Sequence, residues 1–271
     1  DKKLQYNNHF FKSFNVYNRA WQGSREYRLK FTELMVLNDL VKDSLIKFSP
    51  IENNNDYRNH KFCNTDFSIN TTLDHLPVNN SQSCSSADYS ASDYQTCAID
   101  VVLETLFDDD RIHLTEKILR PIACGKPFVL ASTAGSLQYL KNYGFETFGE
   151  LIDESYDKIK DPLQRLQAII KVLKDISQMT NGKKTELFSK MHEIAYKNQT
   201  RFWSNEFIQQ ILNEFDNNFQ AGHEICQQST DAFHWKRQRL YFYNASPACR
   251  QILTAKRQDI VKLFKKIKSL R

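Results

Sequence analysis

Between residues 98 and 144, short apolar runs alternate with helical patterns, and this alternation limits the fold more than any other feature of the chain. Ala98–Leu103 and Pro127–Ala131 have the length and composition of strands that are buried on both faces. A helix is predicted after each run, the first opening at Thr115 and the second at Gly135. Strands that alternate with helices build parallel sheets. The sequence therefore predicts an α/β fold with a Rossmann-like parallel sheet.

The first 50 residues repeat this alternation. A strand is predicted at Ser13–Tyr17, a helix from about 24 to 40, and a second strand at Ser44–Phe48. Residues 51–97 are rich in Asn, Asp, Ser and Thr and have no sustained period. We expect an irregular polar insertion there, with one helical turn near Asn70–Leu76.

The remainder of the chain is predicted to be helical. Pro162 begins a helix whose apolar residues recur at helical spacing, and further helices are expected at about 184–196 and 205–219. The expected organisation has four parts. They are the start of an α/β unit at 1–50, the polar insertion at 51–97, a Rossmann-like core at 98–180 and a helical C-terminal region at 181–271.

Composition argues against several classes of protein. The formal net charge is +5, which is too mild to indicate a nucleic-acid partner by itself. No apolar run approaches the roughly 20 residues that span a bilayer, and no signal peptide is found, so we expect a cytoplasmic protein. The six cysteines lack the spacing of a zinc site, and the carboxylates of Asp108–Asp110 are expected to be solvated or capping. We therefore expect neither a metal nor a cofactor.

Residues 250–271 form a basic amphipathic pattern, and two interpretations of it stay open. Eight lysines and arginines in the segment accompany an apolar face. That face consists of Ile260, Val261, Leu263, Phe264 and Ile267. Such a helix can lie on an anionic membrane surface as a peripheral contact. It can equally pack on its own domain with the lysines in solvent.

The residues with the clearest chemical meaning lie between the two predicted strands of the core. Glu104 ends the first strand, and Thr115-Glu116-Lys117 begins the next helix. In an open parallel sheet, ligands bind beyond the carboxyl ends of the strands, where helix N-termini point. A helix N-terminus offers free N–H groups and a positive dipole end, which suit a diphosphate. Lys117 would add a full positive charge, and Glu116 could accept hydrogen bonds from sugar hydroxyls.

These residues resemble a known motif. Glu104, Thr115-Glu116-Lys117, Arg120 and Gly125-x-Pro127 look like the donor-binding motif of the α1,3-fucosyltransferases. The series as a whole is similar to fucosyltransferase-like and exostosin-like proteins of bacteria, phages and large viruses. Its further elements are Tyr17-Asn18-Arg19, Arg120-Pro121-Ile122, Gly125–Phe128, Gly135-Ser136-Leu137, Gly144–Phe148, Asp153–Asp157 and Asn198–Phe202. The resemblance covers residues 13–48 and 98–205.

The resemblance implies a GT-B glycosyltransferase. Such an enzyme moves a sugar from a nucleotide-diphosphate donor to a glycan or glycoconjugate acceptor, with inversion and without a metal. By carry-over, Glu116 contacts donor hydroxyls, Lys117 contacts the diphosphate, and Arg19 is a second phosphate clamp. Two departures matter: Thr105 stands where the fucosyltransferases have Asn, and little or none of the acceptor domain that usually holds the catalytic base is expected here. The sugar and the base therefore stay open.

Several other residues complete the set of candidates. The loop from Ser132 to Ser136 contains Gly135 and resembles a phosphate cradle. Ser132, Gly135 and Ser136 are therefore predicted to bind the donor, together with Thr115 and Arg120. For catalysis, the candidates are Glu104 and His113, the latter because a histidine beside the triplet can act as a base.

Each candidate also has a purely structural interpretation. Glu104 can cap the next helix from the end of the sheet, and Arg19 can pair with an acidic side chain. Arg120 lies one turn after Glu116 and can form an i,i+4 ion pair with it. Glu116 and Lys117 can be a solvated pair near a helix terminus, and His113 can be a surface residue.

Two rival functions remain beside the enzyme. One is a non-catalytic nucleotide- or glycan-binding module of the same fold within a larger assembly. The other is a nucleic-acid-binding protein that uses the basic C-terminal segment with Trp235, Arg237, Arg239 and Tyr241. Turnover of a nucleotide sugar separates the first rival from the enzyme. Because charge is not concentrated on the predicted sheet domain, we do not expect a specific nucleic-acid partner.

Overall fold

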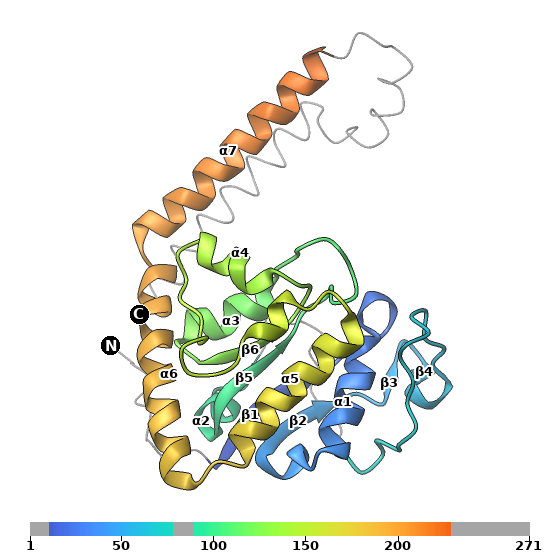
Figure 1. Ribbon diagram of the computed structural model, residues 1–271. Helices are drawn as coiled ribbons and strands as arrows, with labels where there is room; N and C mark the ends of the chain where they lie inside the picture. Colours follow the sequence, from blue (N-terminus) through green and yellow to red (C-terminus); the bar gives the residue numbers. More distant parts are fainter. Residues whose placement is uncertain (1–10, 78–88, 229–271) are drawn as a thin grey trace. The chain divides into compact units, whose positions relative to one another are not determined.

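The computed structural model describes residues 11–77 and 89–228 (Figure 1). In this part of the chain four strands form a parallel sheet in the order β2-β1-β5-β6, and β3 and β4 form a small antiparallel hairpin. The strands are β1 (Lys12–Asn18), β2 (Ser44–Phe48), β3 (Ile51–Glu52), β4 (Asn55–Asp56), β5 (Cys97–Leu103) and β6 (Phe128–Ala131). The helices are α1 (Tyr27–Leu37), α2 (Ala91–Thr96), α3 (Glu116–Cys124), α4 (Ser136–Asn142), α5 (Pro162–Ser177), α6 (Asn181–Phe202) and α7 (Asn205–Gln228). The predicted α/β class with a parallel sheet is confirmed.

Helices cover both faces of the sheet. On one face, the amide of Asn18 in β1 donates to Thr32 of α1, and α5 packs beside α1. Side chains alternate between the two faces of a strand, so Asp100 of β5 points to the other face, where it accepts hydrogen bonds from Tyr94 of α2 and Arg120 of α3. In Figure 1 α5 crosses in front of the sheet. The sheet is therefore the middle layer of three.

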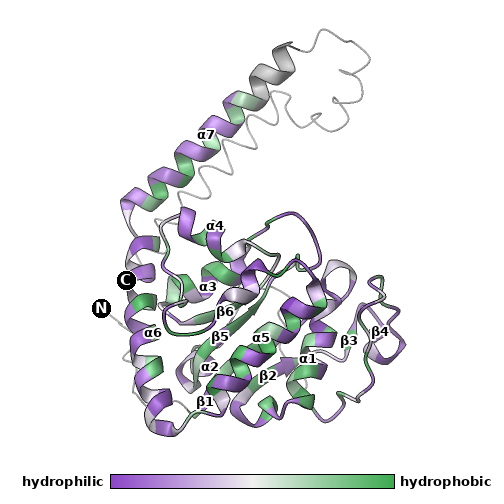
Figure 2. Cartoon of the chain, viewed as in Figure 1, coloured by the Kyte–Doolittle hydropathy of each residue, from purple (hydrophilic) through white to green (hydrophobic). Residues whose placement is uncertain are grey.

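The core consists of the central strands and the helix residues packed against them. Every residue of β5 and β6 is buried, and both strands are coloured as hydrophobic in Figure 2. Phe14 and Val16 of β1 and Leu166 and Ile169 of α5 have no exposed surface. Burial of this kind supplies the main favourable free energy of folding.

Capping residues in the sequence determine where the helices near the site begin. Thr115 is the N-cap of α3, and Gly125 ends that helix in the left-handed conformation with φ +65°. Asp161 caps α5, whose first residue is Pro162. These starts and the strand positions agree with the sequence-based expectation. The expected helix at 184–196 is longer in the structure, because α6 runs from Asn181 to Phe202.

The described residues of the insertion between β2 and β5 are mostly irregular, as predicted, but residues 70–76, where a helical turn was expected, contain a hydrogen-bonded turn and no helix. A helix there would need the amide of Leu73 to bond a backbone carbonyl one turn back. That amide donates instead to the hydroxyl of Tyr57, and the amides of Asn70 and Thr71 donate to the carboxylate of Glu33. Competing acceptors from elsewhere in the fold therefore leave this segment with a single turn, in which the N–H of Leu76 donates to the carbonyl of Leu73 at 3.1 Å.

The chain separates into two compact units, and α7 passes from one into the other. The first unit spans Tyr6–Phe207 and contains the sheet, while the second includes the chain from Ile208 onward. Within α7, Ile211, Phe215 and Phe219 recur every four residues and are partly exposed. None of the helices in the described ranges is long and apolar enough to cross a bilayer. The basic pattern at 250–271 and the residues 235–241 lie outside the described residues.

Candidate functional site

The strand order reverses at one place on the carboxyl edge of the sheet, the position of the ligand crevice in open parallel sheets. The chain passes from β1 to β2 in one direction along the sheet and from β5 to β6 in the other. Ligands of open parallel sheets bind where the strand order reverses, beyond the carboxyl ends of the two strands that diverge. Here that place lies between the ends of β1 and β5. The candidate residues that surround it come from the loops after these strands and from the starts of α1 and α3.

Glu104 closes the start of α3. Its carboxylate accepts hydrogen bonds from the backbone N–H of Thr115 at 3.0 Å and of Ile118 at 3.3 Å, and from the Thr115 hydroxyl at 2.6 Å. The backbone N–H of Thr105 donates to it as well. Glu104 has no exposed surface. It therefore acts as the internal anion that satisfies the free donors of this helix start.

Lys117 lies across the same helix start. Its Nζ is 3.1 Å from the hydroxyl of Thr105, 3.0 Å from that of Thr115 and 3.0 Å from the carboxylate of Glu116. The Lys117 side chain is 15% exposed and the Glu116 side chain is 46% exposed. The cation and the acid of the triplet thus lie side by side at the mouth of α3, with the acid facing solvent.

Arg120 is directed into the sheet rather than toward the helix start. Its guanidinium forms an ion pair with Asp100 at 3.0 Å and donates to the hydroxyl of Tyr94 at 2.7 Å. Desolvation opposes the charge on Arg120, but Asp100 and Tyr94 outweigh it, and the pKa of the guanidinium is raised. This ion pair therefore joins Arg120 to Asp100, whereas the sequence offered Glu116 as the partner.

Arg19 and Arg120 both stack against Tyr17. The guanidinium carbons of Arg19 and Arg120 lie 4.5 Å and 4.9 Å from the centre of the Tyr17 ring. Contacts of this kind between cation and ring are attractive. Tyr17 donates to Asp93 at 2.6 Å, and burial together with that carboxylate raises the pKa of the phenol. Arg19 therefore stands at the end of β1, at the rim of the crevice, in a layer of cations around one tyrosine.

The start of α4 is also closed by a carboxylate. Asp157 accepts a hydrogen bond from the N–H of Leu137, and its backbone carbonyl accepts from the N–H of Gly135 at 2.8 Å. Burial raises the pKa of Asp157, although the amides of this turn oppose that effect. The hydroxyl of Ser136 donates to Ser132 at 3.0 Å, and both serines are buried. The predicted cradle of Ser132, Gly135 and Ser136 is thus a closed turn that binds its own carboxylate.

A third internal anion is bound by the loop between β1 and α1, and no pattern in the sequence indicated it. Glu52 in the β3–β4 hairpin accepts hydrogen bonds from the backbone N–H of Trp21 and from that of Gln22 at 2.7 Å. Arg25 adds an ion pair to the same carboxylate at 2.9 Å. We call these three donors, the two amides and the guanidinium, the β1–α1 nest. Adjacent backbone amides that converge on one point form an anion-binding concavity.

The three internal anions differ in how they are held. Glu104 is fully buried and has four donors, and Asp157 is half-buried within a compact turn. Glu52 lies on a two-residue strand, next to Ile51 with 60% exposure and to the exposed turn at Asn53. The Glu52 side chain is itself 10% exposed, whereas Glu104 has no exposed surface.

Side chains at the start of α1 reach across to the end of β5. The hydroxyl of Tyr27 at the beginning of α1 donates to the backbone carbonyl of Glu104 at 2.7 Å, and Arg28 donates to the carbonyl of Leu103 at 2.8 Å. These bonds tie α1 to the end of β5. Arg25 lies two residues before Tyr27 in the sequence, and Lys117 lies two residues after Thr115, the N-cap of α3. The structure thus brings cations from both loops to the same edge of the sheet.

His113 and the Asp108–Asp110 run lie in the loop between β5 and α3. His113 is exposed, and Asp109 forms an ion pair with Arg111 at 2.6 Å. Within residues 11–77 and 89–228, no group of three or more His, Cys, Asp or Glu side chains is arranged to hold a metal ion.

Sequence reasoning missed the nest for two reasons. Two of its donors are backbone amides, and no residue type in the sequence indicates where backbone amides converge. The third, Arg25, is paired with a carboxylate 27 residues later, in a segment that the sequence marked only as irregular. The available signal was Gly23, whose φ of +63° allows the tight entry to α1.

Comparison of the chain with protein-family models, with curated proteins and with solved structures finds no match. The function is therefore argued from the geometry of the site.

Proposed function

We propose that this chain binds a nucleotide-diphosphate sugar at the carboxyl edge of its sheet and transfers the sugar to a glycan or glycoconjugate acceptor. The observation that supports this most is the β1–α1 nest, where two amides and Arg25 converge on one carboxylate beside the crevice. A diphosphate presents the same kind of anionic oxygen. In open α/β sheets, phosphates bind where such amides meet a helix start.

In this proposal the donor diphosphate replaces Glu52 in the nest. Arg25 and Lys117 then neutralise the charge that develops on the leaving diphosphate, which is the main electrostatic requirement of sugar transfer. Glu116, which is exposed beside Lys117, accepts hydrogen bonds from the donor's hydroxyl groups. Arg25 and Lys117 stabilise the leaving diphosphate without a metal, as in a GT-B enzyme that inverts the anomeric centre.

A base must remove the proton of the acceptor hydroxyl. Of the two predicted candidates, Glu104 is fully buried and engaged with four donors, whereas His113 is exposed in the loop beside α3. We therefore assign the role of base to His113 within this chain.

Binding of nucleoside diphosphates tests the proposal directly. Calorimetry with GDP, UDP, CDP and ADP should show binding of at least one of them. Arg25→Gln and Lys117→Gln should each weaken it about tenfold, the loss expected when one charged hydrogen bond of about 1.4 kcal/mol is removed. Lys190→Gln is the matched control, because Lys190 is an exposed helical lysine paired with Glu186.

The enzyme and the non-catalytic module are separated by turnover. Incubation with the sugar conjugate of the nucleotide that binds should release the free diphosphate in the presence of an acceptor glycan, and His113→Gln should slow this release while leaving binding unchanged. Absence of binding by all four nucleotides at millimolar concentration would remove the basis of the proposal.

A further inference from the structure

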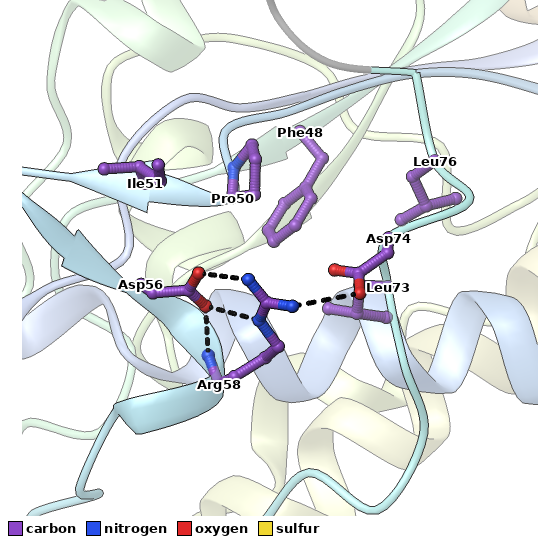
Figure 3. A pocket seen from close by; sticks show the side chains of 8 residues that line it. All are labelled: Phe48, Pro50, Ile51, Asp56, Arg58, Leu73, Asp74 and Leu76. Atoms are coloured by element: carbon purple, nitrogen blue, oxygen red, sulfur yellow. Dashed lines mark hydrogen bonds and ion pairs between the residues drawn. The ribbon is translucent and has the colours of Figure 1, made fainter.

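The charged side chains around a hollow beside β2 pair with one another (Figure 3). This hollow of about 160 Å³ is lined in part by Phe48, the last residue of β2. Arg58 pairs with the carboxylate of Asp56 through Nε at 2.9 Å and Nη2 at 2.5 Å, and its Nη1 lies 3.4 Å from Asp74. The charged groups at this rim therefore have their partners within the unit that contains the sheet.

The helix α7 differs, because it carries an apolar stripe that is partly open to solvent. Ile211, Phe215 and Phe219 expose 37%, 39% and 44% of their surface. Together with Ile208 and Leu212 they recur at spacings of three and four residues, so they share one face of the helix. Figure 2 shows hydrophobic and hydrophilic segments alternating along α7. A stripe of this kind normally packs against another element, so this face of α7 is a docking surface.

The charges of α7 and of residues 250–271 are complementary. The 24 residues of α7 contain no lysine or arginine and four carboxylates, those of Glu206, Glu214, Asp216 and Glu224. Residues 250–271 contain eight lysines and arginines and a single carboxylate, that of Asp259. Opposite charge patterns favour association and select one partner over another. The segment with the charge that α7 lacks is thus present in the same chain.

The chain between the two segments is long enough for them to meet. About 20 residues, 229–249, join them, and at about 3.3 Å per residue these can span up to about 70 Å. The helix α7 has 24 residues, which corresponds to a length of about 36 Å. Residues 250–271 can therefore return along α7.

An antiparallel arrangement matches the two apolar patterns. The stripe of α7 lies in the first two thirds of the helix, whereas the apolar residues of 250–271 are concentrated in its second half. Antiparallel packing brings these two parts together. One register places an apolar residue opposite an apolar residue at three successive contacts, which are Phe219 with Leu263, Phe215 with Ile267, and Leu212 with Leu270.

The same register places opposite charges beside the apolar contacts. Glu214 and Asp216 are the sequence neighbours of Phe215. Successive side chains of a helix are about 100° apart, so these two carboxylates flank the stripe. Lys266 and Lys268 are the neighbours of the residue opposite Phe215, and in a helix they flank its apolar face in the same way. Charges that flank an apolar seam determine which helices pair and in which orientation.

We propose that the apolar stripe of α7 is the docking surface for residues 250–271 of the same chain, which pack on it as an antiparallel helix. The contact covers Phe215 and Phe219, and acid–lysine pairs line both of its edges. Two α7 helices from separate copies would instead bring carboxylates together without any cation of their own. The charge pattern therefore favours an occupant from within the chain over a second copy of α7.

Hydrogen exchange measured by mass spectrometry on the full chain tests the contact. The amides of residues 211–221 should be protected in the native chain. Glu214→Lys with Asp216→Lys sets like charges against each other and should raise their exchange rate about tenfold. Adding Lys266→Glu and Lys268→Glu to that variant restores opposite charges, and the rate should return to within about threefold of the native one.

A matched control uses the same change of charge on another face. Lys262 and Lys265 lie far from Ile267 on a helical wheel, so Lys262→Glu with Lys265→Glu should not restore protection to the Glu214→Lys, Asp216→Lys chain. A second variant, Ile267→Asp, leaves the flanking charges in place. It should raise the exchange rate of the same amides by removing the central apolar contact.

Light scattering and lipid vesicles identify the other occupants. The proposal requires protection of α7 that is independent of protein concentration and present without lipid. Protection that is lost on dilution as a dimer dissociates would assign the stripe to a second copy. Protection that appears only with vesicles containing phosphatidylserine would assign it to a membrane surface. Either result, unprotected amides in the native chain, or a failure of Lys266→Glu with Lys268→Glu to restore protection overturns the proposal.

Discussion

At the scale of single residues, buried carboxylates organise the loops of this chain by accepting hydrogen bonds from backbone amides. Glu33 holds the amides of Asn70 and Thr71, and Glu104 does the same at the start of α3. A buried amide without a partner costs free energy comparable to a lost hydrogen bond. These carboxylates therefore determine where the irregular segments run, as well as balancing nearby charges.

Glu104→Ala should destabilise the protein severely. The substitution leaves the amides of Thr105, Thr115 and Ile118 and the Thr115 hydroxyl without their acceptor in a site closed to solvent. We expect a loss of about 3 kcal/mol in the free energy of unfolding, measured by urea titration. Glu116→Ala, at the exposed neighbouring position, should cost less than about 0.5 kcal/mol. If the two variants are equally stable, Glu104 is not the cap of α3.

His192 should make stability depend on pH. Burial lowers the pKa of its imidazole from 6.5 to about 4. Below pH 6.5 the unfolded chain binds a proton that the folded chain does not bind until about pH 4, so stability is lost as the pH falls through this window. His192→Gln removes that loss, and its stability relative to the native chain should rise by about 2 kcal/mol between pH 7 and pH 4, after allowing for partial exposure.

Urea titrations at several pH values measure this difference. His75→Gln, at an exposed histidine, should follow the pH dependence of the native chain. Parallel pH curves for His192→Gln and the native chain would contradict the assignment.

At the scale of elements, the β3–β4 hairpin places the carboxylate of Glu52 in the nest. Glu52→Gln should tighten the binding of a nucleoside diphosphate, because the native carboxylate competes with the phosphate for the same amides and for Arg25. The expected gain is about five- to tenfold, equivalent to about 1 kcal/mol. Glu150→Gln at an exposed loop position is the control. Calorimetry that shows weaker binding to Glu52→Gln would mean that Glu52 supports the ligand rather than competing with it.

Elements were predictable wherever a local signal defined them. Thr115 and Pro162 mark helix starts, and Gly125 marks a helix end, because caps and left-handed turns depend on residues within one turn of chain. The hairpin that carries Glu52 was not predicted. Its two strands have two residues each, and its register depends on contacts with the distant β1–α1 loop.

The candidate site was predictable in part for the same reason. The sequence placed Glu104 at a strand end beside the α3 start and left open whether it caps the helix or binds a ligand; its four bonds in the structure are those of a cap. Arg120 was expected at the phosphates or paired with Glu116, and the structure pairs it with Asp100. That pairing joins α3 to β5 across the sheet face, and no short-range pattern encodes it.

At the scale of the whole molecule, the proposed site belongs to one unit. The unit from Tyr6 to Phe207 contains the β1–α1 nest, the loop after β5 and the start of α3. Its helix α6 completes the helices next to the site: Gln199 and Trp203 donate to the carbonyl of Ala123 near the end of α3, each at 3.0 Å. The long helix thus fixes α3 from the end opposite to Lys117.

A chain that stops after Gln228 should therefore keep its affinity for the nucleoside diphosphate within about twofold, since the residues of the proposed site all lie in the unit from Tyr6 to Phe207. This truncation removes the basic segment at 250–271, for which the sequence left membrane contact and packing on the domain open. Calorimetry on the full and shortened chains measures the affinity, and flotation with vesicles that contain phosphatidylserine measures membrane binding. Loss of vesicle binding with unchanged nucleotide affinity would separate the two activities along the chain. Loss of nucleotide affinity would show that the segment beyond Gln228 contributes to the site.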